Sequence, residues 1–453
     1  MATSSEKHLV RSTNHSLKFS NTAKLQWNDF FFSEYGNAVI AYVDYLWDAH
    51  IEYITTSKDD VVTHIWDRKE GYLDIPSMIS TVGIPMDSKL SGRALKCAST
   101  QACGIVSAVV EKRVKDLRVY RYAIEHKTRV NAKLLKRLEK DMTKPACKNI
   151  NAELNSVCLE INKSNETSFD IWMNFHSLFK KETFLEGYAP PKTVKYSIPI
   201  KHTKSSRKWD SMGTLMNSCL LTPSYVALRF EIPKPMQRTE GTSVGVDQGK
   251  TTCLTLSDGQ CSTKDIHGHD LKTIIDKLSR KKSGSKNFKQ TCDHRNNYIN
   301  FSVKQLNFDG VHTVNYENIF NIKLGKNVSR EMKHFTNPII RDSLRQHCEV
   351  IGVRFREVEN QCNSIRCSEC GWTQTSNRDK KNKKIFCCKH CQFTDDADFN
   401  ASRTINIRDS LPVLSFEFLV LKYQTKGFFW NPNVHITSKL GEVLTVPHIQ
   451  KKQ

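Results

Sequence analysis

The sequence contains no apolar run approaching the roughly 20 residues that a membrane-spanning helix needs. Its first sixteen residues, MATSSEKHLVRSTNHS, lack the apolar core of a secretory signal. No separate basic amphipathic segment suggests a membrane anchor, and no internal repeat is evident. These absences argue against a membrane or secreted protein and predict a protein of the reducing cytoplasm.

Acidic residues are few relative to basic ones. The chain has 68 Lys and Arg residues against 47 Asp and Glu, a formal net charge of +21, and the excess runs along the whole sequence. Diffuse positive charge without a membrane anchor favours a nucleic-acid partner.

At 453 residues the chain is too long for one ordinary core, so we expect two to four domains.

A disulfide framework is not expected either, because the 15 cysteines are odd in number and scattered. We interpret most of them as small buried hydrophobic residues. One cluster differs, because Cys367 and Cys370 form a C-x2-C pair and Cys388 and Cys391 form a second pair seventeen residues later. Two such pairs suit one structural, tetrahedral Zn2+ better than four unrelated thiols. Cys387 would leave a three-residue spacer and is not assigned.

Three carboxylates occur in contexts that suit catalysis. Asp247 projects from the first strand of SVGVDQGKTTCLTLSDGQ, which we read as strand, bend, strand and hairpin turn. Glu317 ends the run VHTVNYENI, which is typical of a buried central strand, where an unligated carboxylate is costly. Asp398 falls in the first turn of a helix that Asp395 or Asp396 can cap.

Acids delivered by a first strand, a later strand and a helix start are what an RNase H-type nuclease uses to hold two Mg2+ ions about 4 Å apart. One ion helps to generate the attacking hydroxide, and the other stabilises the leaving oxygen. Mg2+ prefers oxygen ligands, whereas thiolates prefer Zn2+, so the two kinds of site should not compete.

Basic stretches supply candidate nucleic-acid contacts, with a solvated surface as the alternative in each case. A helical pattern from Ser99 to about Lys144 contributes Arg118, Arg121 and Arg129. The stretch 277–289 contributes Arg280, Lys281, Lys282 and Lys286. Arg378, beside the cysteine cluster, could bind the scissile phosphate.

The N-terminal half has less specific patterns. Residues 8–20 alternate loosely and predict an extended segment. Aromatic residues then recur at three- and four-residue steps over 27–47, which is more typical of a core than of a base-stacking surface, with Gly36 marking a break. Short β-type runs over 188–235 predict a small β-barrel or sheet domain.

In its C-terminal half the chain resembles the transposon-encoded TnpB nucleases and the miniature type V CRISPR effectors. The resemblance rests on GVDQG (245–249), LSRKKSGSKN (278–287), VNYENI (314–319), CSECG (367–371), NR (377–378), FCCKHC (386–391) and DADFNAS (396–402). It implies that the acids are RuvC catalytic residues holding two Mg2+ ions, namely Asp247, Glu317 and Asp398. It also implies that the four cysteines form the zinc ribbon of the target-nucleic-acid-binding insertion.

The implied function is RNA-guided cleavage of DNA next to a short adjacent motif. The implied partners are a guide RNA, derived from a transposon or a CRISPR array, and a target DNA, with the protein acting as a monomer or homodimer and without a membrane. The implied location is a prokaryotic cytoplasm, with action at the nucleoid.

The resemblance further implies a multidomain α+β protein in which an RNase H-like (RuvC) α/β nuclease domain carries an inserted zinc ribbon. An N-terminal wedge β-barrel and a helical recognition domain complete it. The expected boundaries are 1–20 for the first part of the barrel, 21–187 for the helical recognition domain, 188–235 for the rest of the barrel, 236–243 for a linker, 244–362 and 395–410 for the two parts of the nuclease, 363–394 for the ribbon, and 411–453 for an unassigned tail.

Two residues depart from the family pattern. Gln392 stands where the family usually has glycine, which predicts a less tightly turned second knuckle. Ser402 replaces the usual alanine, a mild change on the helix.

Three other functions compete with guided cleavage. A nuclease-inactive guided binder or transposition accessory factor predicts the loss of an acid, but all three acids are present. An HUH-type transposase needs a hydrophobic residue between two histidines, whereas Gly268 lies between His267 and His269. A zinc-ribbon binder without chemistry leaves Glu317 unexplained.

Overall fold

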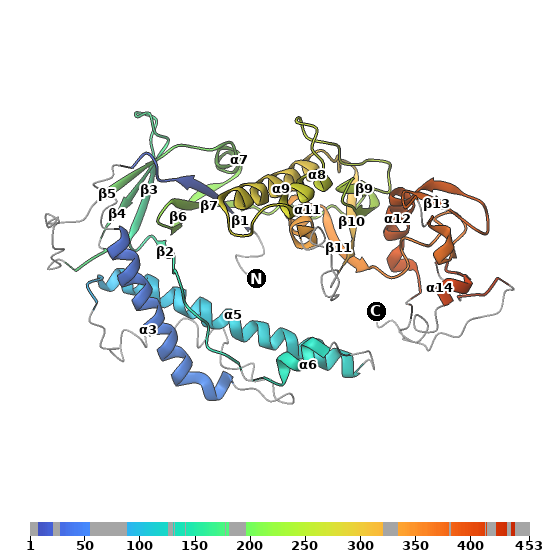
Figure 1. The fold of residues 1–453 in the computed structure, drawn as a ribbon. Helices are drawn as coiled ribbons and strands as arrows, with labels where there is room; N and C mark the ends of the chain where they lie inside the picture. Colours follow the sequence, from blue (N-terminus) through green and yellow to red (C-terminus); the bar gives the residue numbers. More distant parts are fainter. Residues whose placement is uncertain are drawn as a thin grey trace. The chain divides into compact units, whose positions relative to one another are not determined.

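A computed structural model describes residues 8–20, 28–54, 88–125, 130, 132–140, 142–176, 178–180, 196–319, 334–379, 382–412, 414, 423–432 and 436–439. The chain divides into two compact units, Met1–Pro233 and Lys234–Gln453, each with helices and strands (Figure 1). The expectation of a multidomain protein of mixed α and β content is therefore confirmed. No helix among the described residues is long and apolar enough to cross a membrane.

Unit 1 combines four helices with two antiparallel sheets in its described residues. The helices are α3 (Asn28–Ile54), α5 (Gly92–Glu125), α6 (Ala132–Leu138) and α7 (Lys204–Met212). The first sheet has the order β1 (His8–Ser16), β7 (Tyr225–Pro233), β6 (Thr214–Leu221) and β2 (Ala152–Asn155). The second has the order β3 (Leu159–Lys163), β4 (Ile171–Phe175) and β5 (Tyr196–Ile200). Because β1 pairs with β7 from one end to the other, the extended first segment joins the later β region.

Two expectations for unit 1 differ from the structure. The segment 21–187 was expected to be helical, but strands β2, β3 and β4 lie within it and β2 joins the sheet of β1. Gly36 does not break a helix, because α3 is continuous through it. Glycine inside a helix costs only about 1 kcal/mol, and the buried aromatic residues on either side, Tyr35 and Tyr42 among them, outweigh that cost.

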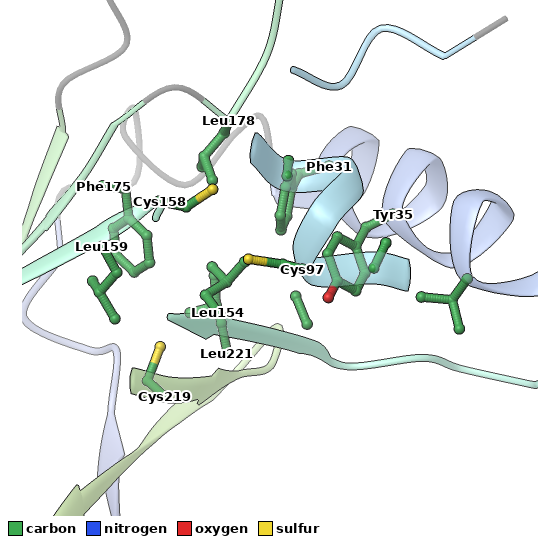
Figure 2. Close-up of a cluster of buried hydrophobic side chains, with 14 of the residues drawn as sticks. Phe31, Tyr35, Cys97, Leu154, Cys158, Leu159, Phe175, Leu178, Cys219 and Leu221 are labelled. Carbon is green, nitrogen blue, oxygen red and sulfur yellow. The ribbon is translucent and has the colours of Figure 1, made fainter. Parts of the chain in front are cut away.

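The aromatic stripe of α3 is core, as its spacing predicts. Phe31 and Tyr35 point toward Cys97 of α5 (Figure 2). The Tyr35 hydroxyl donates to Gln101 Oε1 at 3.0 Å or to the Glu153 carbonyl at 3.1 Å, so its polar end is also satisfied. A buried, hydrogen-bonded ring is not available for stacking on a nucleobase.

Unit 2 is built on a four-stranded sheet with the order β11-β10-β8-β9. These strands are β11 (Arg354–Glu359), β10 (Val311–Asn318), β8 (Thr242–Gln248) and β9 (Leu254–Leu256). The accompanying helices are α8 (Leu271–Ser279), α9 (Lys286–Lys304), α11 (Asn337–Ile351) and α12 (Ala397–Asn406). β10 is parallel to both β8 and β11, and β9 is antiparallel to β8. Val314 and Tyr316 of β10 are buried, which confirms the central strand that their apolar run predicts.

Helix α12 lies against β8 because Gly245 has no side chain. A Cβ at Gly245 would lie 2.1 Å from the Ser402 carbonyl oxygen and 2.4 Å from the Asn406 amide nitrogen. Asn315 of β10 donates to the Asn406 carbonyl at 3.0 Å, which fixes the far end of the helix on the sheet. Gly245, the first glycine of GVDQG, is thus required for the close contact between α12 and β8.

We expect Gly245→Ala to destabilise unit 2 by about 2–3 kcal/mol, because the clash is with helix backbone that cannot rotate away. Thermal or denaturant unfolding would measure the loss. Gly92→Ala is the control, because a Cβ at Gly92 meets nothing within 4 Å. Equal stability of the two variants would contradict the packing described for α12.

Candidate nuclease site and zinc ribbon

The structure brings the three acids identified in the sequence to one edge of the sheet. The parallel register pairs Tyr316 with Val246. The next residues, Glu317 and Asp247, therefore lie side by side near the carboxyl ends of β10 and β8. Asp398 joins them from α12, because a Cβ on Gly249, just past Asp247, would lie 3.8 Å from Asp398 Oδ2.

Asp398 is placed by a helix cap. Asp396 is the N-cap of α12, and its side chain accepts from the Asp398 amide at 2.8 Å. Of the two capping residues considered from the sequence, Asp396 is the one used. Asp398 then stands in the first turn, as expected, with 25% of its side chain exposed.

Crowding and burial perturb all three carboxyls. Burial, with the charges of Glu317 and Asp398 added, raises the pKa of Asp247 well above its ordinary value. Burial raises the pKa of Glu317 to about 7. Burial and the Asp396 charge raise the pKa of Asp398. Each acid nevertheless keeps part of its side chain exposed, so the cluster is reachable and is electrostatically suited to cations.

Arg378 and Asn363 complete the site. The positive charge of Arg378 lowers the pKa of all three acids and so acts against the effect of burial. Its Nη2 lies 3.8 Å from Asp398 Oδ1. Asn363, which the sequence reasoning missed, is buried and donates to Glu317 Oε1 at 3.0 Å and to the Glu359 carbonyl at 2.9 Å. Its only sequence signal is an amide among the polar residues after β11, which is too weak to single it out.

The raised pKa of Glu317 has a measurable consequence for stability. The Glu317 carboxyl has a pKa of about 7 in the folded protein against an ordinary 4.5, so its ionisation destabilises the fold. This destabilisation is absent at low pH and grows as the pH rises between these two values. We expect Glu317→Gln to stabilise the Mg2+-free protein at pH 8 by about 1–2 kcal/mol, discounting for partial exposure.

Denaturant unfolding of both proteins at pH 8 and pH 5 measures this effect. The difference should shrink at pH 5, where the folded wild type holds the proton, and should fall when Mg2+ is added at pH 8. A pH-independent difference would contradict the assigned cause.

The four predicted zinc ligands form one cluster. The sulfur atoms of Cys367, Cys370, Cys388 and Cys391 all lie within 4.8 Å of one another. The separations are 3.7 Å from Cys367 to Cys391 and 3.6 Å from Cys370 to Cys388. Zn–S bonds of about 2.3 Å at tetrahedral angles place sulfur atoms about 3.8 Å apart, so the cluster can hold one Zn2+. Cys387 lies in strand β13 (Ile385–Cys387), outside the cluster.

Both zinc knuckles are closed in the same way. The Gly371 amide donates to the Cys367 carbonyl at 3.0 Å, and the Gln392 amide donates to the Cys388 carbonyl at 3.1 Å. Gly371 and Gln392 both have positive φ, 78° and 63°. The expectation of a looser second knuckle is therefore wrong, because Gln392 adopts the left-handed conformation that glycine would take.

That conformation strains Gln392, since a side chain in the left-handed region costs about 1–2 kcal/mol. We expect Gln392→Gly to raise the stability of the zinc-loaded protein by about 0.5–1 kcal/mol, part of the relief being offset by the flexibility of glycine when unfolded. Thermal melting of the zinc-loaded variant and wild type measures this gain in stability. Gly371→Gln is the opposite control, because its Cβ would lie 1.8 Å from Asn431 Oδ1. A lower melting temperature for Gln392→Gly would contradict the strain.

Two buried asparagines connect the ribbon internally and to the nuclease helix. Asn377 donates to the carbonyls of Ile365 and Trp372, and its Oδ1 accepts from the Lys389 amide at 2.9 Å. Asn400 of α12 donates to the Arg366 carbonyl at 2.7 Å, and Oδ1 of Asn400 accepts from the Ser368 amide at 2.9 Å. The fold around the four cysteines is thus joined to α12, which carries Asp398, and Arg378 follows Asn377 directly.

The tail beyond 411, which the sequence left unassigned, packs on the ribbon in its described part. Strand β15 (Phe428–Phe429) pairs antiparallel with β12 (Trp372–Thr373). Trp430 is fully buried, its Nε1 donates to the Pro412 carbonyl at 2.9 Å, and its own carbonyl accepts from Arg366. The segment is part of the ribbon's support.

Known proteins match part of this chain. Residues 339–405 match the family profile described as Cas12f1-like, TNB domain. The CRISPR-associated endodeoxyribonuclease Cas12f1 of Sulfoacidibacillus thermotolerans is 30% identical over 142 residues, which are 31% of this chain and 32% of that protein. The protein of the same name from Syntrophomonas palmitatica is 27% identical over 140 residues, 31% of this chain and 26% of that protein.

These matches support the expected resemblance to the TnpB and miniature type V effector family. The matched stretches span 32% and 26% of the two curated relatives' lengths. A solved structure, Cas12f1 with sgRNA and target DNA, aligns with 88% of this chain and 99% of that chain at 14% identity. The TM-score of 0.43 is too low for that similarity to carry an argument.

The candidate nucleic-acid contacts have varied surroundings. Arg118 and Arg121 are exposed on α5, and Arg129 lies outside the described residues. Part of the same basic helix is used internally, because Arg113 donates to the carbonyls of Arg137 and Leu138 at the end of α6.

The basic residues between α8 and α9 are more open. Arg280, Lys282 and Lys286 are exposed. Lys281 is half-buried, and its Nζ donates to the Asn287 carbonyl at 3.4 Å. Among all the basic candidates within the described residues, Arg378 is the one that the structure brings to the acids.

Proposed function

We propose that the protein is an RNA-guided DNA endonuclease with a RuvC-type nuclease site. The observation that carries the proposal is the convergence of Asp247, Glu317 and Asp398 at one sheet edge, with the pKa of each raised by burial. Three hard oxygen ligands that repel one another fit divalent cations such as Mg2+. The strand order β11-β10-β8-β9, with an antiparallel edge strand, supports the RNase H-like assignment.

The chain's own groups suggest how the site would work. Two Mg2+ ions, when bound, supply an activated water and stabilise the leaving oxygen. Asp247, Glu317 and Asp398 would hold the ions. Asn363 holds the Glu317 carboxylate in one orientation through its 3.0 Å hydrogen bond.

Arg378 would bind the scissile phosphate. Its guanidinium lies beside the acids, its Nε donates to the Lys383 carbonyl at 3.1 Å, and 32% of its side chain is exposed. That anchoring leaves the Nη atoms to face a phosphate, for which a guanidinium is geometrically suited.

Guidance by RNA would place sequence recognition in base pairing, so the protein needs positive surface more than base-reading side chains. The net charge of +21 and the exposed basic residues between α8 and α9 support this. We assign the role of wedge to the sheet of β1, β7, β6 and β2, that of recognition domain to α3, α5 and α6, and that of target binding to the zinc ribbon.

The test is to purify the protein with the RNA that it retains from its native locus and to sequence that RNA. The complex is then incubated with plasmids that carry the matching target beside a randomised flank, with Mg2+ or with EDTA. We expect Mg2+-dependent linearisation of plasmids with particular flanks. Protected target without cleavage would favour a nuclease-inactive guided binder, and no retained RNA would contradict guidance.

A further inference from the structure

Apart from the four cysteines, the described residues contain a second group of side chains with the geometry of a metal site. Asp265 lies in the loop before α8, His269 precedes the α8 N-cap, and His294 lies on α9. One ligand atom from each lies within 4.8 Å of the others. We propose that these three residues form a second transition-metal site, distinct from the cysteine cluster and from the acid cluster, which takes a divalent ion of the Zn2+ class.

The distances agree with shared coordination. Asp265 Oδ2 lies 3.4 Å from His269 Nδ1 and 3.3 Å from His294 Nε2. Zinc bonds to nitrogen and oxygen of about 2.0–2.2 Å at tetrahedral angles separate ligand atoms by about 3.3–3.6 Å. The direct contacts are long: His294 Nε2 makes a 3.3 Å hydrogen bond to Asp265 Oδ2, and His269 Nδ1 makes none. The same spacing suits an ion held between the three groups.

Asp265 is held rigidly for this role. Its second oxygen, Oδ1, accepts from the amides of His267 and His269, both at 2.9 Å. The loop closes on itself through Gly268, with φ of 75°, whose amide donates to the Asp265 carbonyl at 2.9 Å.

His269 supplies an independent indication. Its Nδ1 is buried and has no hydrogen-bond partner, although it faces Asp265. A buried polar atom of this kind is costly unless something binds it, and a metal ion would do so. Two imidazoles and one carboxylate select Zn2+-class ions over Mg2+, which prefers oxygen ligands. The fourth position is open to water or to exposed His267, whose ring centroid lies 6.3 Å from that of His269.

Lys277 makes a specific prediction possible. Its Nζ lies 2.6 Å from His269 Nε2, which must accept this hydrogen bond. When a metal binds Nδ1, the neutral ring carries its proton on Nε2 and can no longer accept. Lys277 must then move away, so it competes with the metal. Glutamine at this position would instead accept from Nε2–H and support the ligand.

The test uses the full-length protein with Zn2+ in the cysteine cluster and Co2+ as the probe. We expect one Co2+ per chain beyond any held by Asp247, Glu317 and Asp398, seen as ligand-field absorption that depends on the histidines and has no thiolate charge-transfer band. His269→Gln and His294→Gln should each weaken Co2+ binding at least about tenfold, and Lys277→Gln should strengthen it. His312→Gln, a histidine of the same unit outside the group, should leave it unchanged.

Tighter binding in Lys277→Gln cannot arise from misfolding, so it separates the proposal from a general loss of structure. Absence of Co2+ binding, equal binding in both histidine variants and the wild type, or weaker binding in Lys277→Gln would overturn the proposal. Because none of these readouts uses nuclease activity, the result is independent of the function proposed above.

Discussion

Asp247→Asn is expected to lower DNA cleavage by about 10³-fold or more while target binding stays within about twofold of wild type. Asparagine keeps the size of the side chain but removes the charge, and losing one ligand of a two-metal site removes roughly 4 kcal/mol of transition-state stabilisation. The charges of both Glu317 and Asp398 raise the pKa of Asp247, so its carboxyl lies near both of them.

Binding should survive because the charge change makes the site less repulsive to phosphate. Cleavage of a matched plasmid and gel-shift binding of the same target measure the two effects. Asp309→Asn is the control, because Asp309 is exposed in the turn before β10, and it should cleave normally. If Asp247→Asn lost binding together with cleavage, or cleaved as wild type does, the assignment of the catalytic site would be wrong.

Loss of Zn2+ from the cysteine cluster should reduce DNA cleavage as severely as Asp247→Asn does. We expect Cys388→Ser to lose the ribbon's Zn2+ and its fold, because structural zinc contributes an apparent folding free energy of about 10–16 kcal/mol. Unfolding would release the Asn377 contacts that precede Arg378 and the Asn400 contacts that hold α12 to the ribbon. Cleavage should therefore fall even though no acid has changed.

Cys387→Ser is the matched control, because Cys387 is the neighbouring thiol and lies outside the cluster. Zinc content per chain, measured together with cleavage, distinguishes the two variants. Normal zinc in Cys388→Ser, or zinc loss in Cys387→Ser, would contradict the ligand set.

The parts of the site that depend on local pattern could be read from the sequence. Glu317 follows a run with apolar and aromatic residues that is typical of a buried central strand, and Asp398 follows a capping acid. Cysteine spacing selected Cys388 over Cys387, and the structure agrees. These signals are strong because each residue's role is set by its immediate neighbours in the chain.

What the sequence did not reveal depends on contacts between distant segments. Asn363 and Asn400 are ordinary polar residues until the fold buries them against Glu317 and the first knuckle. Phe429 lies 57 residues after Trp372, and nothing near either residue predicts that their strands pair. Gln392 misled the prediction because the closed turn is imposed by two cysteine ligands rather than by the residue's own preference.

Guide exchange tests the central claim most directly. The protein is loaded with its RNA after only the target-complementary segment has been replaced, and cleavage of the original and the new target is measured with Mg2+. The account predicts that cleavage moves to the new target, requires the same flank and is absent in Asp247→Asn. Continued cutting of the original target, or cutting of both targets without preference, would contradict RNA-guided action by this nuclease site.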